Sequence, residues 1–216
     1  MGHLEAVLFD MDGVLTDSEE LIAEAGVRMF AQKGYVVTHD DFYPFRGYGE
    51  NRFLGGVAQK YGIPFDQEQD KARTYDIYCS LVKGNLTPLP GSLDFVRRCR
   101  SLGFKTALVT STDYIKMKAN IDEIGLADGS FDVMINGLDV TRRKPYPDMY
   151  LLAARRLGVP PENCLVVEDA IAGVEAAVAA GCRCLALTSS FSRDELSAAD
   201  WITGSLEEVP EEVLQW

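Results

Sequence analysis

The feature that most restricts the fold of this chain is an alternation of short apolar runs with helical patterns. Five runs are rich in apolar and β-branched residues, at 6–10, 105–110, 132–135, 164–169 and 182–187. Amphipathic stretches with a helical period lie between or beside them, at 92–102, 113–124, 147–157 and 171–180. Apolar strands that alternate with helices are typical of a parallel sheet covered on both faces. The sequence therefore predicts an α/β fold with a parallel sheet.

Residues 18–86 interrupt this alternation. They contain three helical patterns, at 19–34, 51–62 and 67–84, and none of their runs has the apolar character of a buried strand. Two prolines, Pro88 and Pro90, then lead back into the alternating pattern. We therefore predict an all-helical cap over residues 18–86, inserted after the first strand. Residues 1–17 and 87–216 would form the α/β core.

Composition restricts the partners and the compartment. The chain has 33 acidic and 21 basic side chains and a formal net charge of -12, and a field of that sign repels nucleic acid and anionic membrane surfaces. No apolar run is long enough for a bilayer-spanning helix. We expect a monomer that binds a small molecule, with no nucleic-acid binding and no membrane insertion. Five cysteines without metal-type spacing indicate a cytoplasmic or other reducing compartment, including the chloroplast if the chain is a processed or excised domain.

Asp10 and Asp12 come at the end of the first predicted strand. Residues two apart on a strand point the same way, so both carboxylates would lie at the sheet edge where parallel sheets bind ligands. Two close carboxylates repel each other, and a shared proton, a metal ion or a loop that turns one away would relieve the repulsion. An EF-hand loop does not fit, because Gly13 is its fourth and not its sixth residue. A plain helix cap is the structural alternative.

Polar residues also follow three later strands. Thr110 and Ser111 come after the second strand, Lys144 follows the third, and Glu168 and Asp169 end the fourth. Each group alone is also typical of a helix cap or of solvated surface. Together they offer carboxylates, hydroxyls and an ammonium at one edge of the sheet. That set fits a hard divalent cation and a phosphoryl group.

The motifs DMDGVLTDS, LVTST, RRKPYPDMY and VVEDAIAG, in this order, resemble the four signature motifs of the haloacid dehalogenase (HAD) superfamily. The likeness extends from Leu4 to about Leu187, and it is strongest to the β-phosphoglucomutase-like members and sugar phosphatases that have a small helical cap. The resemblance implies a Rossmann-like core that hydrolyses a small phosphorylated metabolite of the sugar or polyol class with Mg²⁺ as cofactor.

The resemblance also implies a role for each matched residue. Asp10 would be the nucleophile that becomes an aspartyl-phosphate, and Asp12 would be the general acid and then the general base. The phosphoryl oxygens would be held by Thr110, Ser111 and Lys144. The ligands of Mg²⁺ would be the Asp10 carboxylate, the Asp12 backbone carbonyl, Asp169 and Glu168, the last two directly or through water.

The polar loop at the start of the second cap helix is expected to select the substrate. Its candidate residues are Arg46, Gly47, Glu50, Asn51 and Arg52, and glycine there would let the backbone approach a ligand closely. Residues 42–62 also resemble the cap of the corresponding domain in a multidomain plant thylakoid protein. We expect the cap to open and close about hinges near residues 16–18 and 87–90.

Two other functions stay open. In the β-phosphoglucomutase branch a cap histidine and a cap-loop arginine serve a second phosphate, and Ile22 and Glu50 stand at the corresponding positions here. These departures weaken the interpretation as a phosphotransferase that isomerises a sugar phosphate. The likeness to a multidomain protein leaves a non-catalytic, regulatory phosphate-binding domain as the other alternative.

Overall fold

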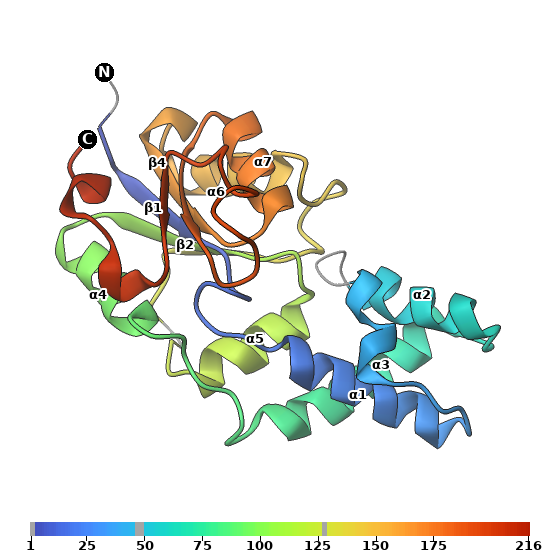
Figure 1. Cartoon of the computed structure of the whole chain (residues 1–216). Helices are drawn as coiled ribbons and strands as arrows, with labels where there is room; N and C mark the ends of the chain where they lie inside the picture. Colours follow the sequence, from blue (N-terminus) through green and yellow to red (C-terminus); the bar gives the residue numbers. More distant parts are fainter. Residues whose placement is uncertain (1–2, 46–49, 127–128) are drawn as a thin grey trace.

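The fold is described from a computed structural model in which residues 3–45, 50–126 and 129–216 are placed well enough to describe. Figure 1 shows a sheet with helices on both faces and a separate group of helices at one side. The strands are β1 (Ala6–Phe9), β2 (Lys105–Val109), β3 (Val133–Ile135), β4 (Cys164–Glu168), β5 (Arg183–Leu187) and β6 (Trp201–Thr203). All pairings between them are parallel, so the predicted α/β class is confirmed.

The order of the strands places β1 inside the sheet. The order is β3-β2-β1-β4-β5-β6, and Ala6 lies opposite Lys105 on one side and Cys164 on the other. After β1 the chain adds β2 and β3 on one side of it, and from β3 it crosses to β4 on the other side. This is the topological switch point at which open parallel sheets bind ligands beyond the carboxyl ends of their strands.

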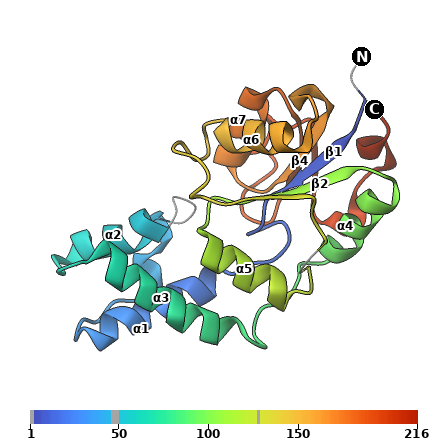
Figure 2. The ribbon, with the colours of Figure 1, turned by 180° about the vertical axis from the view of Figure 1, so that it is seen from behind.

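Four helices cover the two faces of the sheet. They are α4 (Ser92–Ser101), α5 (Tyr114–Glu123), α6 (Asp148–Leu157) and α7 (Ile171–Ala180). Alternate residues of a strand point to opposite faces, so Val7 and Phe9 pack in the same core as α4 and α5, whereas Leu8 packs with α6 and α7. Figure 2 shows the same two layers from behind. Because both faces are covered, β1 is apolar along its whole length and fully buried.

Three helices lie between β1 and β2 in the chain. They are α1 (Glu19–Gln32), α2 (Glu50–Tyr61) and α3 (Gln67–Val82), with short 3-10 turns at His39–Asp41 and Tyr43–Phe45. Aromatic packing joins α1 to α2, since the ring of Phe42 lies 6.4 Å from that of Phe30 on α1 and 4.7 Å from that of Phe53 on α2. The predicted all-helical insert after the first strand is confirmed. Its bounds as a domain, residues 18–86, stay a prediction.

The segments that enter and leave this helical insert lie side by side. Thr16 pairs with Pro88 in an isolated antiparallel bridge, and the Thr16 hydroxyl donates to the Thr87 carbonyl at 2.7 Å. The backbone N–H of Leu89 donates to the carbonyl of Leu15 at 2.9 Å. These segments are the ones in which the sequence predicts the hinges.

The end of the chain departs from the sequence prediction. The short strand β6 was not predicted, and it extends the sheet by pairing with β5. Short 3-10 turns at Pro161–Asn163, Leu206–Glu208 and Glu211–Leu214 complete the described elements. Among the described residues, none of the helices combines the length and apolar character that crossing a membrane requires.

Candidate active site

The chain turns sharply after β1 and presents two carboxylates at its carboxyl end. Asp10 continues the ladder, because its N–H donates to the Val167 carbonyl at 3.0 Å. Gly13 then takes a left-handed backbone conformation, with φ at +78°. A Cβ at this position would lie 1.9 Å from an oxygen of Asp169. Glycine here lets the β1 loop lie directly against the carboxylate at the end of β4.

A cluster of three carboxylates lies where β1 and β4 end. Asp10, Glu168 and Asp169 each offer an oxygen, and these atoms lie within 4.8 Å of one another. The ammonium of Lys144 lies 2.5 Å from Asp10 Oδ1 and 2.5 Å from Glu168 Oε1. In the sequence Asp10, Lys144 and the adjacent pair Glu168 and Asp169 lie far from one another. The fold brings them together, as expected for strand ends at one edge of a sheet.

Burial and mutual repulsion change the acidity of this cluster. Burial raises the pKa of Asp10 to about 7, although Lys144 acts to lower it, and Glu168 and Asp12 raise it further. Burial and the neighbouring Glu168 raise the pKa of Asp169 well above its ordinary value. For Lys144, burial opposes the charge, but Asp10 and Glu168 outweigh burial and raise its pKa above the ordinary value. When all three acids are ionised, Lys144 alone does not balance them, and the cluster carries an excess of negative charge.

Glu168 is held by four donors. Its Oε1 accepts from Lys144 and from the Tyr150 hydroxyl, the latter at 2.6 Å, and its Oε2 accepts the N–H groups of Asp169 and Ala170 at 3.0 and 3.2 Å. The backbone of Gly173 closes over it, since a Cβ there would lie 1.9 Å from the Glu168 carboxyl. A carboxylate with every oxygen engaged has a fixed orientation.

This donor set fits a hard divalent cation. Carboxylate oxygens are the ligands that Mg²⁺ prefers, and the cluster has excess negative charge that such an ion would compensate. Asp10 and Asp169 offer oxygens for direct contact, and Asp169 is oriented by a hydrogen bond from the Ser190 hydroxyl. Glu168, whose oxygens are occupied by protein donors, is better placed to act through an intervening water.

The residues predicted to hold a phosphoryl group lie at the end of the neighbouring strand. Phe9 pairs with Leu108, so the chain after β2 comes out beside Asp10. Thr110 is buried and its hydroxyl oxygen accepts the Thr112 N–H at 3.3 Å, whereas Ser111 is half-buried. Lys144 reaches the same place, since its ammonium lies 3.3 Å from the Val109 carbonyl. Their role toward a phosphoryl group stays a prediction.

The predicted substrate-selecting residues are only partly described. Arg46 and Gly47 lie outside the described residues. Glu50 begins α2, but its side chain is not among those described. Asn51 and Arg52 are exposed on the first turn of α2. The selecting role of these five residues stays a prediction.

Sequence reasoning missed a buried lysine beside Asp12. The ammonium of Lys116 lies 2.9 Å from Asp12 Oδ2, and the lysine is only 3% exposed. A signal was present, because Lys116 and Asn120 are one helical turn apart and flank the apolar positions Met117 and Ile121. Polar side chains so close to an apolar stripe are candidates for buried contacts.

The structure also joins a cap helix to the core by an ion pair. Lys71 of α3 contacts Asp113 at 2.8 Å, and Arg143 contacts the other oxygen of Asp113 at 3.2 Å. A cavity of about 440 Å³ lies beside this contact, and Tyr75 and Tyr114 are among its lining residues. The structure thus places Lys71 at the boundary between the cap and the core.

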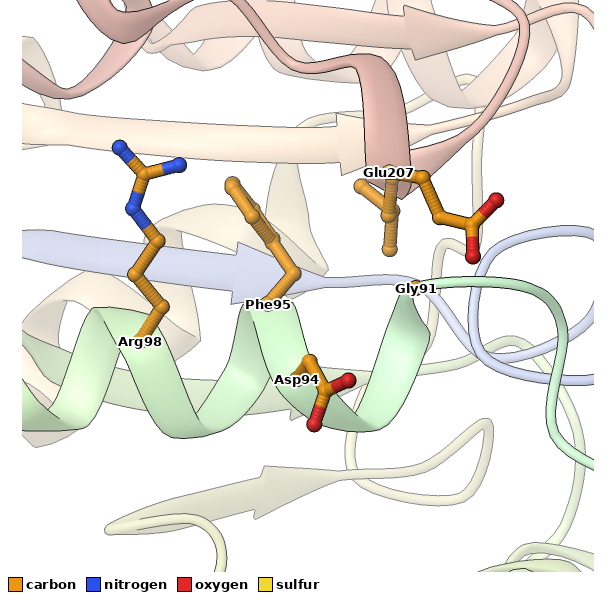
Figure 3. Close-up of a pocket in the computed structure, with 6 residues that line it drawn as sticks. Gly91, Asp94, Phe95, Arg98 and Glu207 are labelled. Atoms are coloured by element: carbon orange, nitrogen blue, oxygen red, sulfur yellow. The ribbon is translucent and has the colours of Figure 1, made fainter.

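A second cavity lies on another part of the core. It has a volume of about 220 Å³ and is lined by residues of α4 and of the C-terminal segment. Figure 3 shows Phe95 and Arg98 extending from α4 on the side of Glu207. None of its lining residues belongs to the carboxylate cluster, so this cavity is not the candidate active site.

Comparison with known proteins agrees with this geometry. The profile of the haloacid dehalogenase-like hydrolase family matches residues 4–181. The chain is 43% identical over 201 residues to Protein SUPPRESSOR OF QUENCHING 1, chloroplastic, from Arabidopsis thaliana, with 92% of this chain but only 19% of that protein covered. It is 36% identical to the Phosphorylated carbohydrates phosphatase of Thermotoga maritima, with 82% of each chain covered.

A solved structure is similar over nearly the whole chain. It is CbbY from Rhodobacter sphaeroides in complex with xylulose-(1,5)bisphosphate, which aligns with a TM-score of 0.89 and 27% identity. The alignment covers 99% of this chain and 100% of that one.

Proposed function

The chain belongs to the haloacid dehalogenase-like hydrolase family, and within it we propose a Mg²⁺-dependent phosphatase of small sugar or polyol phosphates that works through an aspartyl-phosphate. The protein is an enzyme of this family, a phosphatase, and the resemblance found in its sequence motifs is confirmed. The observation that carries the proposal is the contact of Asp10 with Lys144 inside the cluster of carboxylates.

Phosphoryl transfer to the enzyme is the first step. A carboxylate oxygen of Asp10 attacks phosphorus, and the bond between phosphorus and the sugar oxygen breaks. The leaving oxygen takes the proton of the Asp12 carboxyl group, so the sugar departs as a neutral alcohol. Asp10 suits the attack because it lies at the strand end inside the carboxylate cluster, with the Lys144 ammonium 2.5 Å from its Oδ1. Asp12 lies outside that cluster.

Hydrolysis of the aspartyl-phosphate is the second step. A water oxygen attacks phosphorus and gives its proton to the Asp12 carboxylate. The bond between phosphorus and the Asp10 oxygen breaks, inorganic phosphate leaves, and both aspartates return to their starting states. One residue thus donates a proton in the first step and recovers one in the second.

Positive groups must offset the repulsion between a carboxylate nucleophile and an anionic phosphate. Lys144 supplies one charge next to Asp10, and Thr110 and Ser111 would donate to phosphoryl oxygens. Mg²⁺ supplies further positive charge to this pair of anions when it is bound. Its ligands would be Asp10, the Asp12 carbonyl and Asp169, with Glu168 acting through water.

The packing of the cap supports a phosphatase over a sugar-phosphate isomerase of the mutase type. Ile22 stands where the mutase branch has a polar cap residue, and it is 2% exposed within the hydrophobic core. It can give no hydrogen bond to a second phosphate group. A hydrolase needs no such group, since water is its second substrate.

The test is phosphate release from a panel of sugar and polyol phosphates with and without Mg²⁺. We expect Mg²⁺-dependent release that Asp10→Asn abolishes and that the matched control Asp76→Asn leaves unchanged, because Asp76 is an exposed acid of α3. Conversion of a hexose 1-phosphate to the 6-phosphate without phosphate release would favour the mutase. Mg²⁺ binding without turnover of any compound would favour a regulatory phosphate-binding domain.

A further inference from the structure

Both carboxylate oxygens of Asp12 are held by donors from two different elements. Oδ2 accepts from the Lys116 ammonium at 2.9 Å. Oδ1 accepts from the Ser18 backbone N–H at 3.1 Å and also from the Ser18 hydroxyl. Lys116 is the one side chain that donates to Oδ2 within the described ranges. The orientation of the Asp12 carboxyl group therefore depends on α5 and on the start of α1.

Lys116 is an unusual residue for its position. It lies in the first half of α5 and its side chain is 4% exposed, although lysine is among the residues least often buried. Burial of an ammonium group costs free energy unless an opposite charge compensates it. The nearest carboxylates are Asp12 at 2.9 Å and Glu19 at 4.0 Å. The buried charge is thus directed at the proposed acid rather than at solvent.

A second side chain of α5 acts on the other oxygen of Asp12. Asn120, one turn after Lys116, is fully buried, and its Nδ2 donates to the Ser18 hydroxyl oxygen at 3.0 Å. Its Oδ1 accepts from the hydroxyl of Tyr78, a fully buried residue of α3. The donors thus run in one direction, from Tyr78 through Asn120 and Ser18 to Asp12. In both views α5 lies between the sheet and the helices α1 and α3 (Figure 1, Figure 2).

We propose that Lys116 is a positioning residue that holds the Asp12 carboxyl group in line with the leaving oxygen of the substrate. The inference rests on the proposed function, in which Asp12 gives a proton to that oxygen. Proton transfer requires the acid to be within hydrogen-bond reach of the leaving oxygen, and a misplacement of about 1 Å can cost about 100-fold in rate. Without Lys116, the donor that remains to the Asp12 carboxylate within the described part of the chain is Ser18.

Substrates with different leaving groups can distinguish a positioning role of Lys116 from a general structural one. A sugar alkoxide is a poor leaving group and needs the proton of Asp12, whereas p-nitrophenolate is stable without it. Loss of Lys116 should therefore lower kcat/KM for a sugar phosphate much more than for p-nitrophenyl phosphate. A loss of folding or of phosphate binding would lower both by the same factor, because both substrates carry the same phosphoryl group.

The experiment compares Lys116→Met, Lys116→Arg and the matched control Lys118→Met. Lys118 lies on the same helix and pairs with Asp122 at the surface. Each variant is assayed with p-nitrophenyl phosphate and with the sugar phosphate that the wild type hydrolyses fastest. We expect Lys116→Met to lower the ratio of the two kcat/KM values by about 10- to 100-fold. Lys116→Arg should restore part of the ratio, and Lys118→Met should leave it unchanged.

An equal loss on both substrates, or an unchanged ratio in Lys116→Met, would overturn the inference while the proposed function stands. A wild type that releases no phosphate, or an Asp10→Asn variant that remains active, would overturn both. If Lys116→Met does not fold, Lys116→Gln serves in its place, because it keeps a polar side chain of shorter reach. The ratio of its kcat/KM values for the two substrates is then compared with that of the wild type in the same way.

Discussion

Gly13 allows a direct test of how the β1 loop shapes the carboxylate cluster. A Cβ at this position would lie 1.9 Å from Asp169 Oδ2 and 2.3 Å from its Cγ. Contacts of a Cβ below 3.0 Å essentially do not occur, so Gly13→Ala must displace the Asp169 carboxylate or the loop by about 1 Å. The variant therefore combines two costs, a strained backbone and a displaced acid.

Gly181 provides the matched control. Its φ is also +78°, and nothing lies within 4 Å of the Cβ that an alanine would add. The left-handed conformation costs a non-glycine residue about 1–2 kcal/mol, and both variants share that cost. Forcing a side chain into occupied space costs about 1–3 kcal/mol more. We expect Gly13→Ala to lose about 1–3 kcal/mol more unfolding free energy than Gly181→Ala.

The assay has two parts, urea unfolding and titration of phosphatase activity with Mg²⁺. Because Asp169 is displaced only in Gly13→Ala, this variant should need at least about 10-fold more Mg²⁺ for half-maximal activity. Gly181→Ala should keep the Mg²⁺ requirement of the wild type. Equal losses of unfolding free energy and equal Mg²⁺ requirements in the two variants would refute the role assigned to Gly13.

Two further predictions concern the same cluster. Tyr150→Phe removes the hydroxyl that donates to the buried carboxylate of Glu168. It should lower the free energy of unfolding, measured by urea denaturation, by about 1.5–3 kcal/mol. A change below about 0.5 kcal/mol would contradict this. In the metal-free fold the pKa of Asp10 is raised from 3.8 to about 7. The folded protein therefore holds this proton more tightly than the unfolded chain, and the stability that the proton contributes is lost as the pH rises through that window. Mg²⁺ should therefore raise the melting temperature more at about pH 8 than at about pH 5; equal thermal shifts would speak against it.

The sheet and most helices could be predicted from sequence because their patterns are local. β1 is apolar throughout, β2 ends and β4 begins with an apolar run, and amphipathic helices lie between the strands. β6 was not predicted, because Trp201–Thr203 offers only two apolar residues, whereas the equally short β3 is apolar throughout. It pairs with β5 alone, and such an edge strand depends on tertiary contacts rather than on its own pattern.

The carboxylates of the site could be predicted for a topological reason, and their partners could not. Parallel strands bring their carboxyl ends to one edge, so Asp10 and Asp169 were expected to meet. The contact of Lys116 with Asp12 depends on how α5 lies against the loop after β1, and that of Lys71 with Asp113 depends on how α3 lies beside α5. A lysine on a helix is usually solvated, and only the packed structure distinguishes these two.

The paired segments at Thr16 and Thr87 bear on how enzymes of this architecture can diversify. The chain leaves the sheet near Thr16 and returns to it near Thr87, and these two segments, which we call the stem, are hydrogen-bonded to each other. Everything beyond the stem can be lengthened, shortened or exchanged without altering the register of any sheet strand. The cap, whose role in substrate selection stays a prediction, can thus vary while the sheet and its strand-end residues are kept, provided that a new cap again contacts Asp113 and Asn120 of the core.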